Sequence, residues 1–329
     1  MREWRNWQTR TFEGRVVHPY GFKSRFSHQS RTRTACEQSA PYSRKRCAEI
    51  TFRTACAKEA IELVTKALPD MLVGAGTVLT PEQADEAFAA GAKFVVSPGF
   101  NPRVVKHCIE KGIPILPGCA TPGEVEAAME LGLKAVKFFP AEAAGGINMI
   151  KSMSAPYAGV KFMPTGGINE DNMLSYLSFG KVIACGGSFM VKDSLIEAGK
   201  FDEITALTRS AVMKMLGFKL VHVGINCDNK EEATKTAKLV SSLFGLEYKE
   251  GNKSTFCGTD FEFMHTKFYG KNGHIAIATN FPDRAKAYLE SKGVSFIEES
   301  AGYDDKGNLK IIYLKDEICG FALHLVKKQ

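Results

Sequence analysis

The sequence predicts an α/β protein with two folded parts: a (β/α)8 barrel in which one βα unit is missing, and an α+β domain of paired βαβββ modules. Two observations lead to this prediction. Up to about residue 215, short apolar runs alternate with segments of helical period, a pattern typical of parallel strands joined by helices. From residue 216 onward, the pattern of one strand, one helix and three strands occurs twice. Such self-similarity indicates an internal repeat.

The first part contains seven strand candidates, each followed by a helix candidate. They are CAEITFRT (47–54), MLVGAGTV (71–78), KFVVSPG (93–99), IPILPGCA (113–120), AVKFFP (135–140), VKFMPTGGI (160–168) and KVIACGGSFM (181–190). Two helix starts share one signature, in which Thr80 precedes Gln83 and Thr121 precedes Glu124, each with a proline directly after the threonine. This is the pattern of an N-cap with its capping-box partner. Because a (β/α)8 barrel needs eight strands, one unit is missing from the pattern.

One lysine, Lys137, interrupts the apolar strand AVKFFP. A lone lysine is more often a solvated residue of an edge strand, but the strand-helix units on both sides of Lys137 predict that it is buried here. Burial would lower its pKa and leave a neutral amine that can attack a ketone and form a Schiff base. Glu49 and Arg53 on the first strand are candidates for proton transfer and anion binding, because barrel sites lie at the C-terminal ends of strands. They could equally form an ordinary surface ion pair.

Two glycine pairs follow the last two strands, in PTGG (164–167) and CGGS (185–188). Bare amides at a helix start attract anions, and these loops of a barrel often bind phosphate. One such pair is more often only a tight turn. Two pairs at these places favour an anion site.

Residues 48 to about 214 resemble the pyruvate-dependent class I aldolases that cleave 2-keto-3-deoxy-6-phosphogluconate and 4-hydroxy-2-oxoglutarate. The motifs EITFRT, GAGTVLT, SPG, PG-C-AT-P, KFFPAE, PTGGI and GGSFMV follow the family's order and spacing. The resemblance implies a lyase without a cofactor that acts on a small keto acid and forms a homotrimer through the barrel. It implies Lys137 as the Schiff-base lysine and Glu49 as the general acid/base, acting through water. The substrate contacts that it implies are Arg53, Thr77, Pro98, Phe139, Thr165, Gly166, Gly167, Gly187 and Ser188.

The alternative to an enzyme is a catalytically inactive barrel that binds phosphate or sugar acids and carries a metal-binding sensor module. It follows from the missing first unit, because a barrel without one strand has two open ladder edges.

The first 46 residues differ from the rest in composition. They contain nine Arg, two Lys and three Glu, a net charge of +8, whereas the rest of the chain carries −1. A basic arm with aromatic residues, here Trp4 and Trp7, is one form of nucleic-acid binder. We interpret residues 1–46 instead as a disordered or artefactual leader that replaced the first βα unit, and we expect no nucleic-acid partner. The only candidate for a substitute strand is RVVHPYGF (15–22), which its proline weakens.

Residues 216–329 resemble the vicinal oxygen chelate superfamily, the glyoxalase-like fold, at HVGI, at the restart HIAI and at the last strand after LKD. The resemblance implies one metal ligand from the first and last strand of each module. These ligands are His222, Glu262, His274 and His324. Three imidazoles and a carboxylate suit Zn²⁺, Fe²⁺, Ni²⁺ or Mn²⁺ without selecting among them. The open alternative is a polar cup without metal, because scattered histidines are weak evidence.

Length and composition fit this organisation. With 329 residues, of which 44% are hydrophobic, the chain can form two cores: we divide it into a leader (1–46), a barrel (47–215) and a chelate-like domain (216–329). No apolar run approaches the length of a membrane span. The nine cysteines show no paired spacing, which indicates free thiols in a reducing cytoplasm.

Overall fold

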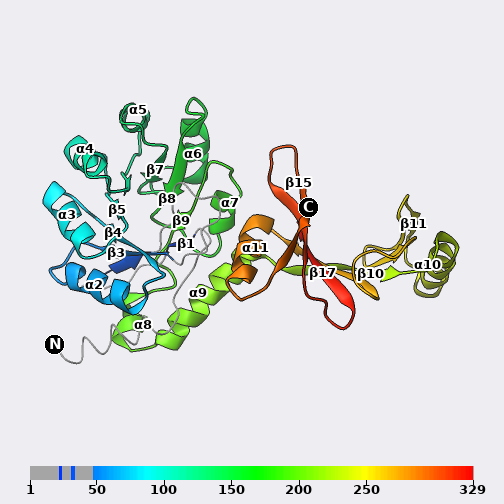
Figure 1. The fold of residues 1–329 in the computed structure, drawn as a ribbon. Helices are drawn as coiled ribbons and strands as arrows, with labels where there is room; N and C mark the ends of the chain where they lie inside the picture. The colour runs from blue at the N-terminus through cyan, green and yellow to red at the C-terminus, as the bar shows by residue number, and fades with distance from the viewer. Residues whose placement is uncertain (1–21, 24–30, 34–46, 329) are drawn as a thin grey trace. The chain divides into compact units, whose positions relative to one another are not determined.

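The computed structural model describes residues 22–23, 31–33 and 47–328 (Figure 1). Most of the predicted leader, including all but the last residue of the candidate strand 15–22, lies outside these ranges. The chain divides into two compact units, Met1–Val212 and Met213–Gln329. The boundary falls within helix α9 (Phe201–Leu216). No helix in the described ranges is long and apolar enough to cross a lipid bilayer.

The described part of the first unit has a strand at each of the seven predicted runs (Figure 1). They are β3 (Cys47–Thr51), β4 (Leu72–Gly76), β5 (Phe94–Val96), β6 (Ile115–Leu116), β7 (Ala135–Phe138), β8 (Lys161–Pro164) and β9 (Cys185–Gly186). Parallel ladders join β3 through β6 in order, and another joins β7 to β8. Parallel bridges connect Gly118 with Lys137 and Thr165 with Gly186. The strands thus follow each other around a TIM-like α/β unit, as predicted.

Helices alternate with these strands. They are α2 (Ala57–Ala67), α3 (Pro81–Ala89), α4 (Pro102–Glu110), α5 (Pro122–Glu130), α6 (Gly146–Ser154), α7 (Met173–Leu177) and α8 (Asp193–Glu197). Both predicted caps are present. Thr80 accepts a hydrogen bond from the backbone N–H of Gln83, and Thr121 forms a reciprocal capping box with Glu124.

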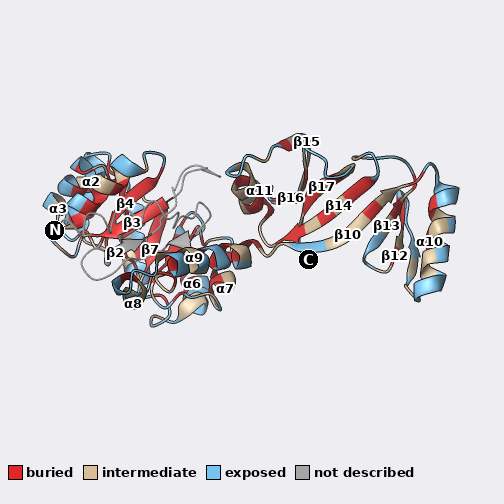
Figure 2. Cartoon of the chain, turned by 90° about the horizontal axis from the view of Figure 1, so that it is seen from below, coloured by how far each residue is buried: buried red, intermediate tan, exposed pale blue. Residues whose placement is uncertain are grey.

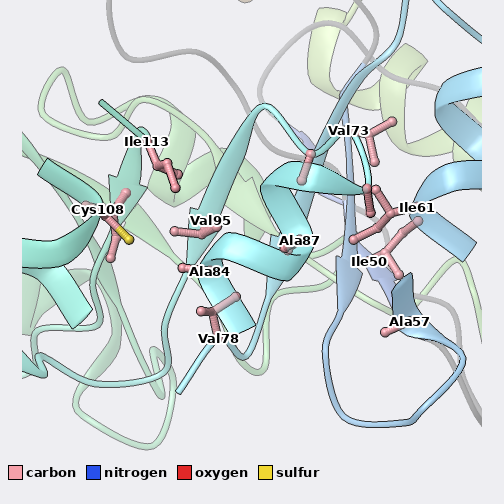
Figure 3. Close-up of a cluster of buried hydrophobic side chains, with 14 of the residues drawn as sticks. Ile50, Ala57, Ile61, Val73, Val78, Ala84, Ala87, Val95, Cys108 and Ile113 are labelled. Carbon is pink, nitrogen blue, oxygen red and sulfur yellow. The ribbon is translucent and has the colours of Figure 1, made fainter. Parts of the chain in front are cut away.

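Alternation along the strands separates two sets of buried side chains, because successive residues point to opposite faces. The set that packs against the helices is drawn in Figure 3 and includes Ile50, Ile61, Val73, Val95 and Ile113. The other set lies on the inner face and includes Cys47, Leu72, Phe94, Leu116, Ala135 and Met163. Glu49 alternates with Ile50 and Lys137 stands two residues after Ala135, so both share the inner face.

Two short strands of the predicted leader pair with the barrel. Strand β1 (Phe22–Lys23) lies parallel to β9, and β2 (Arg31–Arg33) lies antiparallel to β3, with Arg33 opposite Glu49. These ladders lie on the two strands that a missing first strand would leave open. The described residues of this section therefore pair with strands of the barrel, whereas we expected a disordered or artefactual leader. Its artefactual origin stays a prediction.

The second unit is one eight-stranded sheet with two helices. The first half contains β10 (Lys219–Asn226), α10 (Lys230–Phe244), β11 (Tyr248–Glu250), β12 (Ser254–Cys257) and β13 (Phe261–Met264). The second contains β14 (Gly273–Thr279), α11 (Pro282–Glu290), β15 (Phe296–Tyr303), β16 (Leu309–Leu314) and β17 (Phe321–Lys327). The order β11-β12-β13-β10-β14-β17-β16-β15 places the first strands of both halves side by side at the centre, antiparallel to each other. In both units buried residues concentrate on the strands (Figure 2).

Candidate functional site

Lys137 lies on β7 with its side chain on the inner face of the barrel. Its backbone N–H donates to the Pro117 carbonyl (2.8 Å), and its own carbonyl accepts from the N–H of Cys119 (2.7 Å). Only 1% of its surface is exposed, and Nζ lies 4.6 Å from the centroid of the Phe139 ring. Lysine is rarely buried to this extent unless it is paired or functional. The predicted burial is confirmed, and Lys137 is the centre of the candidate site.

Glu49, on β3, is the second ionisable group of the inner face and is fully buried. Its carboxylate lies against the backbone of Gly76 at the end of β4, where a Cβ would stand 1.9 Å from Glu49 Oε1. Only glycine leaves room for the carboxylate there. Our sequence reasoning missed Gly76, although the alternating glycines of VGAG were a signal for a close approach.

Three predicted substrate contacts lie near the C-terminal ends of the strands. Arg53 is exposed just beyond β3, and Pro98 is half-buried after β5. Thr77 follows β4 with φ at +59°, a conformation that is a genuine outlier for a β-branched residue. Such strain persists only where the surroundings enforce it, and it is concentrated at functional sites.

The predicted anion loops come together in one pocket. It is lined by Thr165, Gly166, Gly167, Ile168, Gly186, Gly187 and Ser188. Gly166 and Gly167 have φ values of +105° and +78°, which non-glycine residues rarely adopt. The Thr165 hydroxyl is buried, with no hydrogen-bond partner within the described ranges. A buried polar atom without a partner is costly, so the pocket suits a polar ligand.

One expectation about these loops was wrong. We predicted each glycine pair at the start of a helix, but α7 begins at Met173 and α8 at Asp193, several residues downstream, and each has only five residues. Any attraction for an anion therefore comes from the loop amides and not from a helix dipole.

Phe139 connects the buried lysine with the glycine loop. Its ring lies beneath Lys137 Nζ and also 3.4 Å from the position that a Cβ of Gly166 would occupy. On the other side of the loop, Glu142 accepts a hydrogen bond from the Tyr176 hydroxyl. A Cβ on Gly167 would stand 2.5 Å from Glu142 Cγ. Our sequence reasoning missed Glu142, which ends the motif KFFPAE.

A second candidate site lies in the second unit, where the four predicted ligands converge. His222 Nε2 and His274 Nε2 are 3.1 Å apart. Glu262 Oε2 lies 3.2 Å from His222 Nε2 and 3.1 Å from His274 Nε2. Ser254 Oγ donates to the other Glu262 oxygen at 2.5 Å. The ligand atoms of His222, His274 and His324 all lie within 4.8 Å of one another.

His324 is the most isolated member of this His-Glu cluster, which we define as His222, Glu262, His274 and His324. It is 3% exposed, and neither ring nitrogen has a hydrogen-bond partner among the residues that the structure describes. Burial, followed by the charges of His274 and His222, lowers the pKa of His324 to about 3, and the Leu325 backbone acts in the opposite direction. His324 is therefore a neutral imidazole at neutral pH, which is the form that binds a metal.

The carboxylate of the cluster is held ionised. Burial raises the pKa of Glu262, but hydrogen bonds from His222, His274 and Ser254 outweigh it and leave that pKa well below its ordinary value.

Strand register explains the convergence of the four side chains. Gly224 on β10 stands opposite both Glu262 and His274, and a Cβ there would meet His274 Cε1 at 2.1 Å. Our sequence reasoning missed Gly224.

Comparison with known proteins shows that the first unit is similar to a family of aldolases. A family described as "KDPG and KHG aldolase" matches residues 43–207. The 2-dehydro-3-deoxy-phosphogluconate aldolase of Treponema pallidum is 53% identical over 167 residues, which cover 51% of this chain and 80% of that protein. The KHG/KDPG aldolase of Escherichia coli K12 is 45% identical over 167 residues, with 51% and 78% covered. A solved KDPG aldolase from Legionella pneumophila has a TM-score of 0.48 at 42% identity, with 50% and 79% covered.

Proposed function

The chain belongs to the KDPG and KHG aldolase family, and from this premise we propose that it is a Schiff-base aldolase. It cleaves 2-keto-3-deoxy-6-phosphogluconate, or 4-hydroxy-2-oxoglutarate, into pyruvate and an aldehyde. The observation that supports this most directly is Lys137, almost fully buried on the inner face of the barrel. The names of relatives at 53% and 45% identity point to the same substrates. These comparisons give no support to the alternative, a catalytically inactive barrel that binds phosphate or sugar acids.

In the proposed reaction, the Lys137 amine attacks the substrate ketone and water leaves, so that a protonated imine forms. The imine accepts electrons, and the C3–C4 bond breaks to give an enamine of pyruvate. Glu49 takes the proton of the C4 hydroxyl through water while the aldehyde departs. Return of a proton to the enamine and hydrolysis then release pyruvate and free Lys137. The pocket at Thr165–Gly167 and Gly187–Ser188 would hold the anionic ends of the substrate.

Borohydride reduction in the presence of pyruvate tests this proposal. We expect one covalent adduct, located by mass spectrometry on the peptide that contains Lys137. Lys137→Arg should abolish it. The matched control is Lys161→Arg, because Lys161 stands at the exposed start of the neighbouring strand β8. An adduct on another lysine, or no adduct, would contradict the assignment.

For the second unit we propose that the His-Glu cluster binds one divalent transition metal, in keeping with its resemblance to the vicinal oxygen chelate fold. The supporting observation is His324, a buried neutral imidazole whose two nitrogens lack partners among the described residues. Three nitrogens and one carboxylate oxygen suit a transition metal. A bound metal would polarise a ligand oxygen or lower the pKa of bound water.

Equilibrium dialysis of the full chain against Zn²⁺ or Co²⁺, after treatment with a chelator, tests the metal site. We expect about one ion per chain and a rise in melting temperature with metal concentration, because a ligand of the native state stabilises it. His222→Ala with His274→Ala should abolish both effects. The control is His265→Gln, since His265 is buried directly after β13 but bonds to Thr255 outside the cluster. Absence of binding would favour the polar cup without metal.

Two finer expectations complete the proposal. The first is a homotrimer formed through the barrel, which light scattering on the purified chain tests. The second is a cytoplasmic location. It is supported by the described cysteines, which are free thiols, as a reducing compartment maintains them.

A further inference from the structure

Phe256 and Tyr313 occupy equivalent positions in the two halves of the second unit. In the first half, Phe256 on β12 stands opposite Glu262. In the second half, Tyr313 on β16 stands opposite His324. Each is thus the aromatic neighbour of the outer member of the His-Glu cluster. The strand arrangement is the same in both halves, so the two positions differ only in their side chains, phenylalanine in the first half and tyrosine in the second.

The two rings contact the cluster differently. The Phe256 ring meets His222 edge-on, with centroids 5.8 Å apart and planes at 87°. The Tyr313 ring stacks on His324, with centroids 4.7 Å apart and planes at 28°. Stacking covers one face of an imidazole and restricts rotation about its last torsion, which is otherwise broad.

His324 lacks the support that metal-binding histidines usually have. Such a histidine normally donates its second ring N–H to a carboxylate, carbonyl or water, which fixes the ring orientation. Neither nitrogen of His324 has a hydrogen-bond partner among the described residues. Packing must therefore orient this ring, and the closest ring contact is Tyr313.

Tyr313 is itself held from behind. The Tyr269 ring packs on it with centroids 4.6 Å apart and planes at 37°. Tyr269 belongs to the segment that joins the two halves, and Asn226 anchors this segment. Asn226 Nδ2 donates to the Gly270 carbonyl (2.8 Å), and its Oδ1 accepts from the N–H of Phe268 (3.2 Å). Asn226 lies on β10, the strand that carries His222. The pair of tyrosine rings is therefore held at one end by its stacking on His324 and at the other by the segment that Asn226 anchors.

We propose that Tyr313 is a positioning residue of the metal site, whose ring, backed by Tyr269, holds the His324 imidazole in the orientation that binds metal. This rests on the proposed metal-binding function of the second unit. The ring replaces the usual hydrogen bond to the second nitrogen. The hydroxyl has no part in this, so phenylalanine should serve equally well at position 313.

Titration of the metal-free full chain with Co²⁺, followed by its visible absorption, tests the proposal. Tyr313→Leu should weaken Co²⁺ binding by about 10- to 100-fold, the usual effect of losing an outer support of a ligand, and should change the Co²⁺ spectrum. Tyr313→Phe should restore both affinity and spectrum. The matched control is Phe256→Leu at the equivalent position, which should change the affinity by less than about 3-fold. Tyr269→Leu should cause a smaller loss in the same direction, and decides the matter if Tyr313→Leu does not fold.

The outcomes separate this inference from the metal site itself. If the unaltered chain binds no Co²⁺, the proposed metal site is wrong. If it binds Co²⁺ and Tyr313→Leu binds with the same affinity and spectrum, only the positioning role is overturned. An equal loss in Tyr313→Phe, or in Phe256→Leu, would also overturn it, because the effect would then not depend on the stacked ring.

Discussion

At the scale of single residues, the first unit combines a buried acid with a strained neighbour. Glu49 lies against Gly76, and the next residue, Thr77, has a φ of +59°. A left-handed conformation costs a non-glycine residue about 1–3 kcal/mol. The chain tolerates this cost directly beside the proposed proton-transfer group, which supports the expected contact between Thr77 and the substrate.

Glu49→Gln should separate proton transfer from imine formation. The amide keeps the size of the side chain but cannot accept a proton, so turnover should fall by about 10²- to 10⁴-fold. Trapping of pyruvate on Lys137 should survive, because the imine forms at the lysine. Steady-state kinetics and borohydride trapping on the same preparation measure both. A parallel loss of trapping and turnover would make Glu49 a residue of folding or substrate binding.

Thr77→Gly should increase stability while it lowers activity. Relief of the strained conformation gains about 1–2 kcal/mol, and the greater freedom of glycine in the unfolded chain removes about 0.5–1 kcal/mol. The net change should be a stabilisation of about 0–1.5 kcal/mol, with a higher KM because a substrate contact is lost. Thr65→Gly, inside helix α2, is the control and should destabilise. Urea unfolding measures the stability of both variants, and steady-state kinetics measure the KM of Thr77→Gly. A clear destabilisation in Thr77→Gly would show that the strain is not released.

At the scale of elements, both sites rely on a glycine in the strand beside a functional side chain. Gly76 on β4 faces Glu49, and Gly224 on β10 faces His274. In each case a methyl group would stand closer to the functional side chain than atoms can approach. Strand pairing thus provides the space that each group occupies.

Gly76→Ala should displace the Glu49 carboxylate without disturbing Lys137. Misplacement of a catalytic group by about 1 Å can cost about 10²-fold in rate, so turnover should fall by at least about 10-fold while imine trapping persists. Gly123→Ala is the matched control, because a Cβ there meets nothing within 4 Å. Kinetics of the two variants should therefore differ. Unchanged turnover in Gly76→Ala would mean that the carboxylate position is not critical.

At the scale of the whole molecule, the leader contributes strands to the barrel. The ladders of β1 with β9 and of β2 with β3 pair backbone groups on two strands that the missing unit would otherwise leave open. Unpaired strand edges are also templates for association with other chains. We therefore expect the N-terminal section to stabilise the barrel.

Deletion of residues 1–46 tests this contribution. Loss of both ladders should lower the melting temperature by about 2–4 °C for each kcal/mol removed and should increase aggregation. Differential scanning calorimetry measures the first effect and light scattering the second. An unchanged melting temperature, together with unchanged aldolase turnover, would mean that the leader is detached, as its composition alone suggests.

Local sequence patterns are sufficient to predict many elements of this protein. The seven barrel strands, the caps at Thr80 and Thr121, the strand-helix repeat of the second unit and the burial of Lys137 could all be predicted. These features depend on the alternation of apolar residues and on capping preferences over a few neighbouring positions. Strand position also selected Lys137, Glu49, Arg53 and the two glycine loops as candidates. The resemblance to known families then added the other substrate contacts of the barrel and the four metal ligands of the second unit.

The contacts between residues far apart in the chain depend on tertiary pairing. His222, Glu262, His274 and His324 converge because four strands adopt one register, and Tyr313 reaches His324 through the pairing of β16 with β17. The pairing of β1 and β2 with the barrel and the delayed starts of α7 and α8 were equally outside local prediction. The physical reason is that register is set by contacts between strands far apart in the chain, so no local window of sequence contains it.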